Sequence, residues 1–407
     1  MNTENILSIN YGVYNAIRML IGVYHAAFLI STGVSISQLA ILQIVFSVTV
    51  LILDFPLSVF ADRYYRKQLV VSGVFFTILF YPLCIQSPNI VALVSAELFY
   101  AIGICSISGA IEGWILSSLN GKNEKFSLCT HLCERVSSFG SVITGVLGIL
   151  TAYLSDSYKY GYFISVALML IVLIVFVFTE DNKNERAFYT RKSIVKQARE
   201  SINLIIKNND GIYFLSITCI FTLGMQVIYH FWQPIMLSGG DFGLLSKKEL
   251  ITLLMCHVGA FSMQYIANYF MPKINVKSKS YTLIIMLLSF FSSVACFLLF
   301  VLIINNSILS LVAYSVIHGM VSTLPVGAQN IFISRLDDEV KNIISGALGF
   351  VSFSCRVASI VVLAFISILP DEIPVARYVF ISAAAYFLCG FLFLKWFSNK
   401  TDVIYEN

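Results

Sequence analysis

The sequence predicts an all-α polytopic membrane protein with twelve transmembrane helices and both termini in the cytoplasm. Of the 407 residues, 58% are hydrophobic and only 12% are charged, whereas soluble domains average about 25% charged residues. Apolar runs long enough to cross a bilayer recur twelve times, and lysines and arginines gather in alternate loops between them. A soluble core cannot hide this much apolar sequence, so the chain belongs in a lipid bilayer.

The apolar runs divide evenly between the two halves of the chain. A helix needs roughly 20 apolar residues to cross about 30 Å of hydrocarbon. In the first half, the runs cover residues 9–31, 37–61, 68–87, 89–119, 133–155 and 159–179. In the second half, they cover residues 211–237, 248–271, 281–304, 307–333, 342–368 and 374–397. Each half is therefore expected to form six helices.

Basic residues set the orientation of these helices. The loops after the even-numbered helices and the C-terminal tail, counted together with Lys395 just before that tail, hold 19 of the 26 lysines and arginines. The opposite side holds only Lys159, Lys247, Lys248 and Arg377. This distribution predicts that both termini are cytoplasmic. The first ten residues contain neither a basic segment nor a small-residue cleavage site, so we expect no cleaved signal peptide.

The longest connection separates two domains. We expect an N-terminal six-helix bundle over residues 1–179, a linker over 180–209, a C-terminal six-helix bundle over 210–397 and a cytoplasmic tail over 398–407. Apolar residues recur at helical spacing in the linker, between basic ones, which predicts an amphipathic helix on the cytoplasmic surface. Basic residues there suit anionic lipid, and we expect no nucleic-acid partner.

The loop between the second and third helices carries the most informative motif. Residues 58–67 read SVFADRYYRK, which resembles the G-x-x-x-D-R-x-G-R-R/K signature of the major facilitator superfamily. Ser58 and Tyr65 replace the two glycines. Ser58 is still small enough for close helix approach, whereas Tyr65 resists the left-handed turn that glycine permits. A degenerate second copy, NYFMPKINVK, stands at residues 268–277, in the equivalent loop of the second half.

Shorter motifs resemble the bacterial drug-efflux (drug:proton antiporter) members of this superfamily. DFPLS at residues 54–58, SGAIEGW at 108–114 and WQP at 232–234 are similar to segments of their helices 2, 4 and 7. An aspartate of the family's helix 4 is missing here, and Ser117 stands near its place. The resemblance implies two pseudo-symmetric six-helix bundles that rock about a midplane cavity.

The same resemblance implies how such a chain works and where. A proton gradient would drive it, and we expect no cofactor. The expected partners are protons, the lipid bilayer and a small-molecule or peptide-like substrate. We expect a monomer that crosses the bacterial cytoplasmic (inner) membrane many times.

Ionisable residues within the apolar runs are few, because each costs about 2.5–3.5 kcal/mol to insert. We expect Asp54, Glu112, Arg18 and Arg135 to form one network in the inner half of the N-terminal bundle. Its carboxylates either bind and release a proton as the cavity opens to each side, or only fasten the helices together.

Further polar residues are candidates for the substrate cavity. Arg356 has no obvious acidic partner in its own half, and it suits an anionic substrate group or an acid of the other bundle. Glu97 suits either a local pair or the transport path. The outer half of helix 7 is either a substrate wall or an interfacial aromatic belt, and helix 10 offers hydrogen-bond donors to substrate. These candidates are Gln226, Tyr229, His230, Trp232, Gln233, Gln329 and Asn330.

The family resemblance implies that Asp62, Arg63, Arg66 and Lys67 latch the cytoplasmic gate. A carboxylate near the N-terminus of helix 11, around Asn342, would meet the positive end of that helix dipole. Plain positive-inside anchoring would explain the three cations but not Asp62.

Missing motifs narrow the function further. The chain has no HExxH, GxSxG or Walker-type GxxxxGK sequence, so we expect neither an enzyme nor an ATP-driven pump. It has no CxxC or Cys/His cluster, so we expect no metal site. Export of a toxic amphipathic compound is the leading prediction. The alternatives are export of a peptide-like antibiotic giving self-immunity, proton-coupled metabolite import, and a receptor or scaffold.

Overall fold

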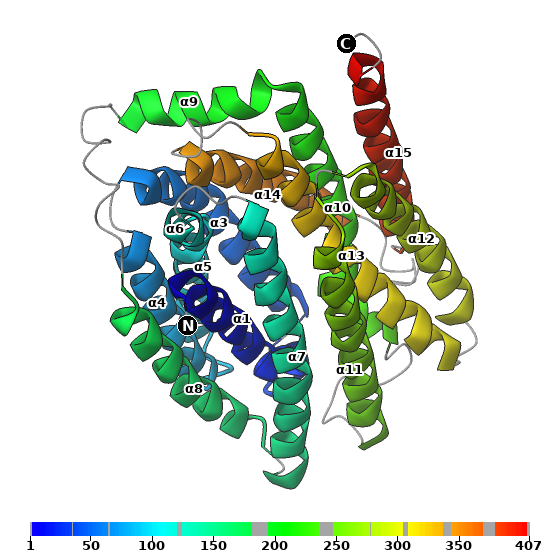
Figure 1. Ribbon diagram of the computed structural model, residues 1–407. Coiled ribbons are helices and arrows are strands. Elements are labelled where there is room, and N and C mark those ends of the chain that lie inside the picture. The colour runs from blue at the N-terminus through cyan, green and yellow to red at the C-terminus, as the bar shows by residue number, and fades with distance from the viewer. Residues whose placement is uncertain are drawn as a thin grey trace.

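The structure is a computed structural model that describes eleven segments of the chain (Figure 1). They are residues 2–34, 36–63, 66–119, 124–155, 157–180, 194–236, 247–276, 278–303, 308–336, 343–368 and 379–404. Within these segments the secondary structure is helical, without strands.

The helices follow the expected order. The first half contains α1 (Thr3–Gly22), α2 (His25–Ser31), α3 (Ile36–Arg63), α4 (Arg66–Cys84), α5 (Ile90–Ile107), α6 (Ala110–Ser118), α7 (Glu124–Ser155) and α8 (Lys159–Phe178). The linker forms α9 (Ile194–Ile206). The second half contains α10 (Asn209–Met236), α11 (Lys247–Phe270), η2 (Met271–Lys273), α12 (Lys279–Ile303), α13 (Ile308–Ser334), α14 (Ile344–Ile368) and α15 (Val379–Ile404). The tail expected to begin at residue 398 therefore starts as a continuation of α15.

Ten helices in the described segments are long and apolar enough to span a membrane, with α5 and α6 together making one of them. The long helices α1 and α10 complete the twelve expected crossings. Both contain polar residues, since α1 carries Asn10, Asn15 and Arg18 and α10 carries Asp210 and Gln226. Polar residues within membrane helices normally face a protein interior, and both helices pack among the others of their own half.

The two halves meet along two pairs of helices. We call the contact of α3 with α14 the first seam, and the contact of α7 with α11 the second seam. These helices are the second, eleventh, fifth and eighth crossings. Exchanging the two halves turns one seam into the other, as a six-plus-six repeat requires. The expected pseudo-symmetry is therefore visible in the packing between the bundles.

The linker helix α9 lies across one end of both bundles in Figure 1. It packs against α10, α14 and α3. Ser201 and Ile205 are fully buried in this contact, and the Ser201 hydroxyl donates to the Ile343 carbonyl oxygen at 3.4 Å. The amphipathic surface helix expected from the sequence thus covers the cytoplasmic end of the first seam.

The fourth crossing is broken within the membrane. The sequence predicts one continuous helix over residues 89–119, whereas α5 ends at Ile107 and α6 begins at Ala110. Between them, Gly109 adopts a φ of 70°, a conformation that side chains other than glycine rarely adopt. Such broken helices are tolerated in a bilayer only where protein or a cavity surrounds the freed backbone groups.

Candidate functional site

The break in the fourth crossing organises the candidate site. Gly109 is the N-cap of α6, and the carboxyl of Glu112 accepts hydrogen bonds from the backbone N–H groups of Gly109 and of Glu112 itself. This arrangement is one half of a capping box, in which the third helical residue reaches back to the N-cap amide. The SGAIE sequence therefore starts the half-helix α6 and fixes Glu112 at the break. One oxygen of Glu112, Oε2, is buried without a hydrogen-bond partner.

Asp54 reaches the same break from α3. It is 1% exposed, and its carboxyl interacts with the hydroxyls of Ser108 and Ser352. Ser108 lies at the break, and Ser352 lies on α14 of the other bundle. Oδ1 of Asp54 is buried without a hydrogen-bond partner. This carboxyl thus lies where the broken helix and the first seam meet.

Arg356 supplies the positive charge from the other bundle. Its guanidinium interacts electrostatically with Asp54 across the first seam and lies over the ring of Phe46 at 5.6 Å from the ring centroid. The sequence left two interpretations of this arginine, an anionic substrate group or an acid of the other bundle. In the structure, the acid that interacts with Arg356 is Asp54 of the N-terminal bundle.

The two N-terminal-bundle carboxyls Asp54 and Glu112 interact electrostatically with each other, and Glu112 also interacts with Glu134 of α7. A group of three acids therefore lies between the broken helix and the two seams. Protonation of one member therefore changes the energy of charging its neighbours.

Arg18 and Arg135, expected in the same network, have other neighbours. Arg18 Nε donates to the Tyr100 hydroxyl at 2.8 Å, and a terminal nitrogen donates to Asn15 Oδ1 at 3.1 Å. Its guanidinium also lies over the Tyr100 ring. Arg135 Nε is buried without a hydrogen-bond partner. The guanidinium in electrostatic contact with Asp54 is that of Arg356.

A polar stripe along α7 forms the second seam. Gln264 Nε2 of α11 donates to Glu134 Oε2 at 2.9 Å, and His257 Nε2 lies 2.9 Å from the Ser141 carbonyl oxygen. This seam was not predicted from the sequence. The sequence nevertheless contains a pattern that could have indicated it. Polar residues follow one another at intervals of four and three residues, which places them on one face of α7: Ser127, His131, Glu134, Ser138 and Ser141.

The contacts between the bundles extend from their cytoplasmic ends toward the middle of the membrane. Near the cytoplasmic end of the first seam, Phe55 of α3 packs edge-on against Phe350 of α14. Near that of the second seam, Thr130 of α7 donates to Asn330 Oδ1 of α13 at 3.3 Å. This structure therefore has a closed cytoplasmic side.

Two cations of the loop motif bind backbone carbonyl oxygens inside the N-terminal bundle. Arg66 donates to the Gly113 carbonyl oxygen of α6 at 2.9 Å, and Lys67 donates to the Thr179 carbonyl oxygen after α8 at 2.8 Å. The Thr179 carbonyl oxygen lies at the C-terminus of α8, where cations are attracted, whereas Gly113 lies in the first half of α6. These contacts tie α4 to α6 and α8. The side chains of Asp62 and Arg63, and Asn342, lie outside the described residues.

The remaining cavity candidates are dispersed. Trp232 stacks on Tyr314 at 5.6 Å, and Gln226 is buried. Asn330 lies at the cytoplasmic end of the second seam, and Gln329 beside it is half-buried. Glu97 is buried in the N-terminal bundle, in electrostatic contact with Cys84 and Tyr162. The side chains of Tyr229, His230 and Gln233 lie outside the described residues.

Comparison with known proteins places this architecture among transporters. A sequence model described as Major Facilitator Superfamily matches residues 7–360. The uncharacterized MFS-type transporter YxaM of Bacillus subtilis (strain 168) is 26% identical over 228 residues, which cover 54% of this chain and 55% of that protein. The match thus spans about half the length of this curated relative.

Two solved structures share the fold over nearly the whole chain. A bacterial homologue of the iron transporter ferroportin, in an outward-facing state, has a TM-score of 0.72 at 14% identity and covers 98% of this chain and 100% of its own. The E. coli fucose:proton symporter FucP has a TM-score of 0.69 at 15% identity and covers 97% of each chain. At these identities the likeness concerns the fold.

Proposed function

Because this chain belongs to the major facilitator superfamily and is a membrane transporter, we propose that it exports a toxic amphipathic small molecule in exchange for protons. The exchange proceeds by alternating access of the two bundles. The proposed location is the bacterial cytoplasmic membrane.

The observation that carries this proposal is the position of Asp54. Its carboxyl lies at a helix break, beside Glu112, and interacts across the first seam with Arg356. A buried ionisable group in a membrane helix usually marks a substrate or proton path. Here the same group also joins the two bodies that must separate for transport.

The charge of Asp54 determines how strongly the first seam holds. As a carboxylate, Asp54 attracts Arg356 and keeps α3 and α14 together on the cytoplasmic side. A proton that arrives from outside neutralises the carboxyl and removes this attraction, so the inner side can open. Release of the proton to the cytoplasm restores the carboxylate and favours closure again. Glu112 is coupled electrostatically to this cycle and holds the break in shape.

Transport by the purified chain tests the proposal. Proteoliposomes with an imposed pH gradient should accumulate or release a candidate compound, and an uncoupler should abolish this flux. Candidate compounds come from a resistance screen with and without expression. Asp54→Asn should remove gradient-driven flux while substrate binding and yield are retained. Undiminished gradient-driven flux in both Asp54→Asn and Glu112→Gln would refute proton coupling through this site.

Two other transported substrates remain candidates. The mixture of acids and arginines within the helices suits a zwitterionic or peptide-like antibiotic, whose export would give self-immunity. Metabolite import is the other, since a fucose:proton symporter shares the fold. The direction of flux under one imposed gradient separates export from import, because an antiporter and a symporter move substrate in opposite directions. A receptor or scaffold would give no flux at all.

A further inference from the structure

A buried histidine at the cytoplasmic end of the second seam joins four helices. His131 of α7 is fully buried. Its Nδ1 lies 2.9 Å from Asn268 Oδ1 of α11, and its Nε2 lies 3.4 Å from the Tyr281 hydroxyl of α12 and 3.4 Å from Asn330 Nδ2 of α13. One imidazole thus connects the N-terminal bundle to three helices of the C-terminal bundle.

The hydrogen-bond partners specify a neutral imidazole. Asn268 Nδ2 donates to the Gln264 carbonyl oxygen at 3.1 Å, which leaves its Oδ1 as an acceptor facing His131 Nδ1. On the other side of the ring, the Asn330 amide nitrogen is a donor, and the Tyr281 hydroxyl can also donate. Nδ1 therefore carries the hydrogen and Nε2 accepts, as in one tautomer of neutral histidine.

A proton on Nε2 would disrupt this arrangement. The new N–H would face the amide donor of Asn330, and two donors cannot bond each other, so only the Tyr281 hydroxyl could turn to accept it. The ring would also gain a positive charge in electrostatic contact with Arg135, four residues along α7. Both effects weaken the contact between α7 and α13.

The groups that contact the ring from the other helices carry no negative charge. On α11 the facing polar side chain is Asn268, and Gln264 one turn away binds Glu134. The group on α12 is the phenol of Tyr281, and that on α13 is the amide of Asn330. Two cations of the C-terminal bundle have partners other than His131. Arg335 binds Asp210, and the Lys273 ammonium after α11 lies over the Tyr269 ring.

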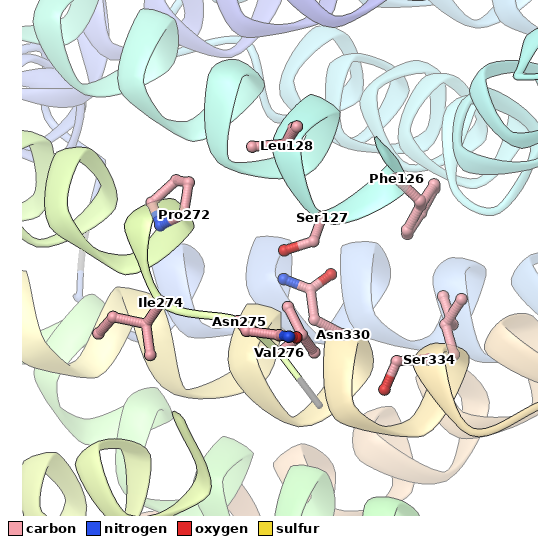
Figure 2. A pocket seen from close by; sticks show the side chains of 10 residues that line it. Phe126, Ser127, Leu128, Pro272, Ile274, Asn275, Val276, Asn330 and Ser334 are labelled. Carbon is pink, nitrogen blue, oxygen red and sulfur yellow. The ribbon is translucent and has the colours of Figure 1, made fainter. Parts of the chain in front are cut away.

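A cavity leads from the cytoplasmic end of the seam to this cluster. It has a volume of about 230 Å³ and is lined from α7, from η2 with the loop after it, and from α13 (Figure 2). Ser127, Asn275, Asn330 and Ser334 supply its polar wall. Because Asn330 both lines the cavity and contacts His131, a small movement of this amide connects the imidazole to the space.

We propose that His131 is a proton-sensitive latch of the cytoplasmic gate: the neutral imidazole holds the second seam closed, and protonation from the cytoplasm opens it. A falling cytoplasmic pH would then favour the inward-open state. The proposal rests on alternating access in this family, but on neither the substrate nor the coupling role of Asp54.

Distance measurements on the full-length chain in lipid nanodiscs test the latch. Spin labels at Lys125→Cys on α7 and Lys273→Cys on η2, both exposed sites, report the width of the gate in a chain whose nine native cysteines are replaced. We expect a narrow distribution at pH 8 and a wider one at pH 5.5. His131→Gln should remove the part of this shift that the imidazole contributes, so that at most a smaller shift due to Asp54 remains. His318→Gln, at a buried histidine within the C-terminal bundle, should preserve the full shift.

A second variant keeps the test decisive if His131→Gln folds poorly. Asn330→Asp offers an acceptor to a protonated Nε2, so the gate should widen less at pH 5.5 than that of the wild type. The proposal is overturned if the wild-type distance does not change with pH, if His131→Gln retains the full shift, or if Asn330→Asp widens like the wild type. The measurement needs neither substrate nor gradient, so a chain that exports no tested compound can still confirm or refute it.

Discussion

Gly349 of α14 packs directly against Ser58 of α3, with no room for a methyl group between them. A Cβ atom on Gly349 would lie 2.4 Å from the Ser58 Cβ, far inside van der Waals contact. Because the two residues belong to different bundles, the first seam closes only if one of them lacks a side chain. The small residue expected from the loop motif thus has a partner that the motif does not contain.

Gly349→Ala should shift the transporter toward the inward-open state, because the added methyl group prevents close approach of α3 and α14. The label pair at positions 125 and 273 should report a wider gate at pH 8. Ser58→Gly in the same chain should restore closure, since it removes the atoms in the way. Gly390→Ala is the matched control, because its Cβ would meet the Phe290 ring inside one bundle. An unchanged gate in Gly349→Ala would contradict this packing argument.

Asp54 and Arg356 should be energetically coupled. Their side chains interact electrostatically across the first seam, so Asp54→Asn and Arg356→Gln should each lower the melting temperature by an amount small enough for the protein still to fold. The double variant should be more stable than the sum of the two losses predicts, yet inactive in gradient-driven transport. Thermal melting in detergent measures all three. Additive losses would mean that the two side chains do not interact.

Two variants should separate the structural role of Glu112 from its role in proton coupling. Glutamine can also accept the N-cap hydrogen bond, so Glu112→Gln should retain stability, whereas Glu112→Leu should lose about 1 kcal/mol. If the carboxyl also takes part in proton coupling, Glu112→Gln should still lose gradient-driven flux. Full transport by the glutamine variant would assign Glu112 to the capping box alone.

Gly109→Ala should damage the helix break. A residue other than glycine at this backbone conformation costs about 1–3 kcal/mol, and relief of that strain would displace Asp54 and Glu112 from their partners. We expect lower stability and lower flux together. Gly22→Ala at the end of α1 is the control, because its Cβ would only reach ordinary contact with Met19 at 3.4 Å. Wild-type flux in Gly109→Ala would show that the break needs no glycine.

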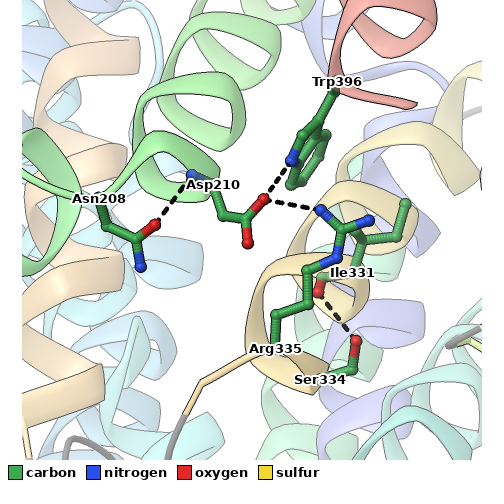
Figure 3. Close-up of polar contacts among 6 residues, drawn as sticks. All are labelled: Asn208, Asp210, Ile331, Ser334, Arg335 and Trp396. Carbon is green, nitrogen blue, oxygen red and sulfur yellow. Dashed lines mark hydrogen bonds and ion pairs between the residues drawn. The ribbon is translucent and has the colours of Figure 1, made fainter. Parts of the chain in front are cut away.

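Asp210 should stabilise the C-terminal bundle without acting in transport. In Figure 3 its Oδ1 accepts from Arg335 at 2.7 Å and from Trp396 Nε1 at 2.6 Å, and this joins the cytoplasmic ends of α10, α13 and α15. A hydrogen bond to a charged group contributes about 1.5–3 kcal/mol, so Asp210→Asn should lower the melting temperature clearly. Trp396→Phe should lower it less, and Lys395→Gln at an exposed neighbour should not.

Flux per folded molecule should stay near the wild-type value in Asp210→Asn. A specific loss of transport, at unchanged stability, would place this cluster in the transport path instead.

The sequence by itself predicted the membrane class, the crossings and their pseudo-repeat. These properties depend on local quantities, namely the length of each apolar run and the charges beside it. The superfamily motif and the candidacy of Asp54 also came from residues close together in the chain. Even the stripe of His131 and Glu134 on α7 has a helical spacing that the sequence contains.

Only the tertiary structure decided what these residues face. Helical periodicity assigns side chains to one side of a helix, but it does not say which helix lies opposite. His131 and Asn268 are 137 residues apart, and Asp54 meets an arginine of the other bundle rather than Arg18 of its own. The break at Gly109 was not predicted either, because an apolar run predicts one continuous helix whether or not the backbone turns within it. Which residues meet across the seams depends on how the two bundles dock. Docking in turn depends on the shape and chemistry of both bundle surfaces, which no short stretch of sequence contains.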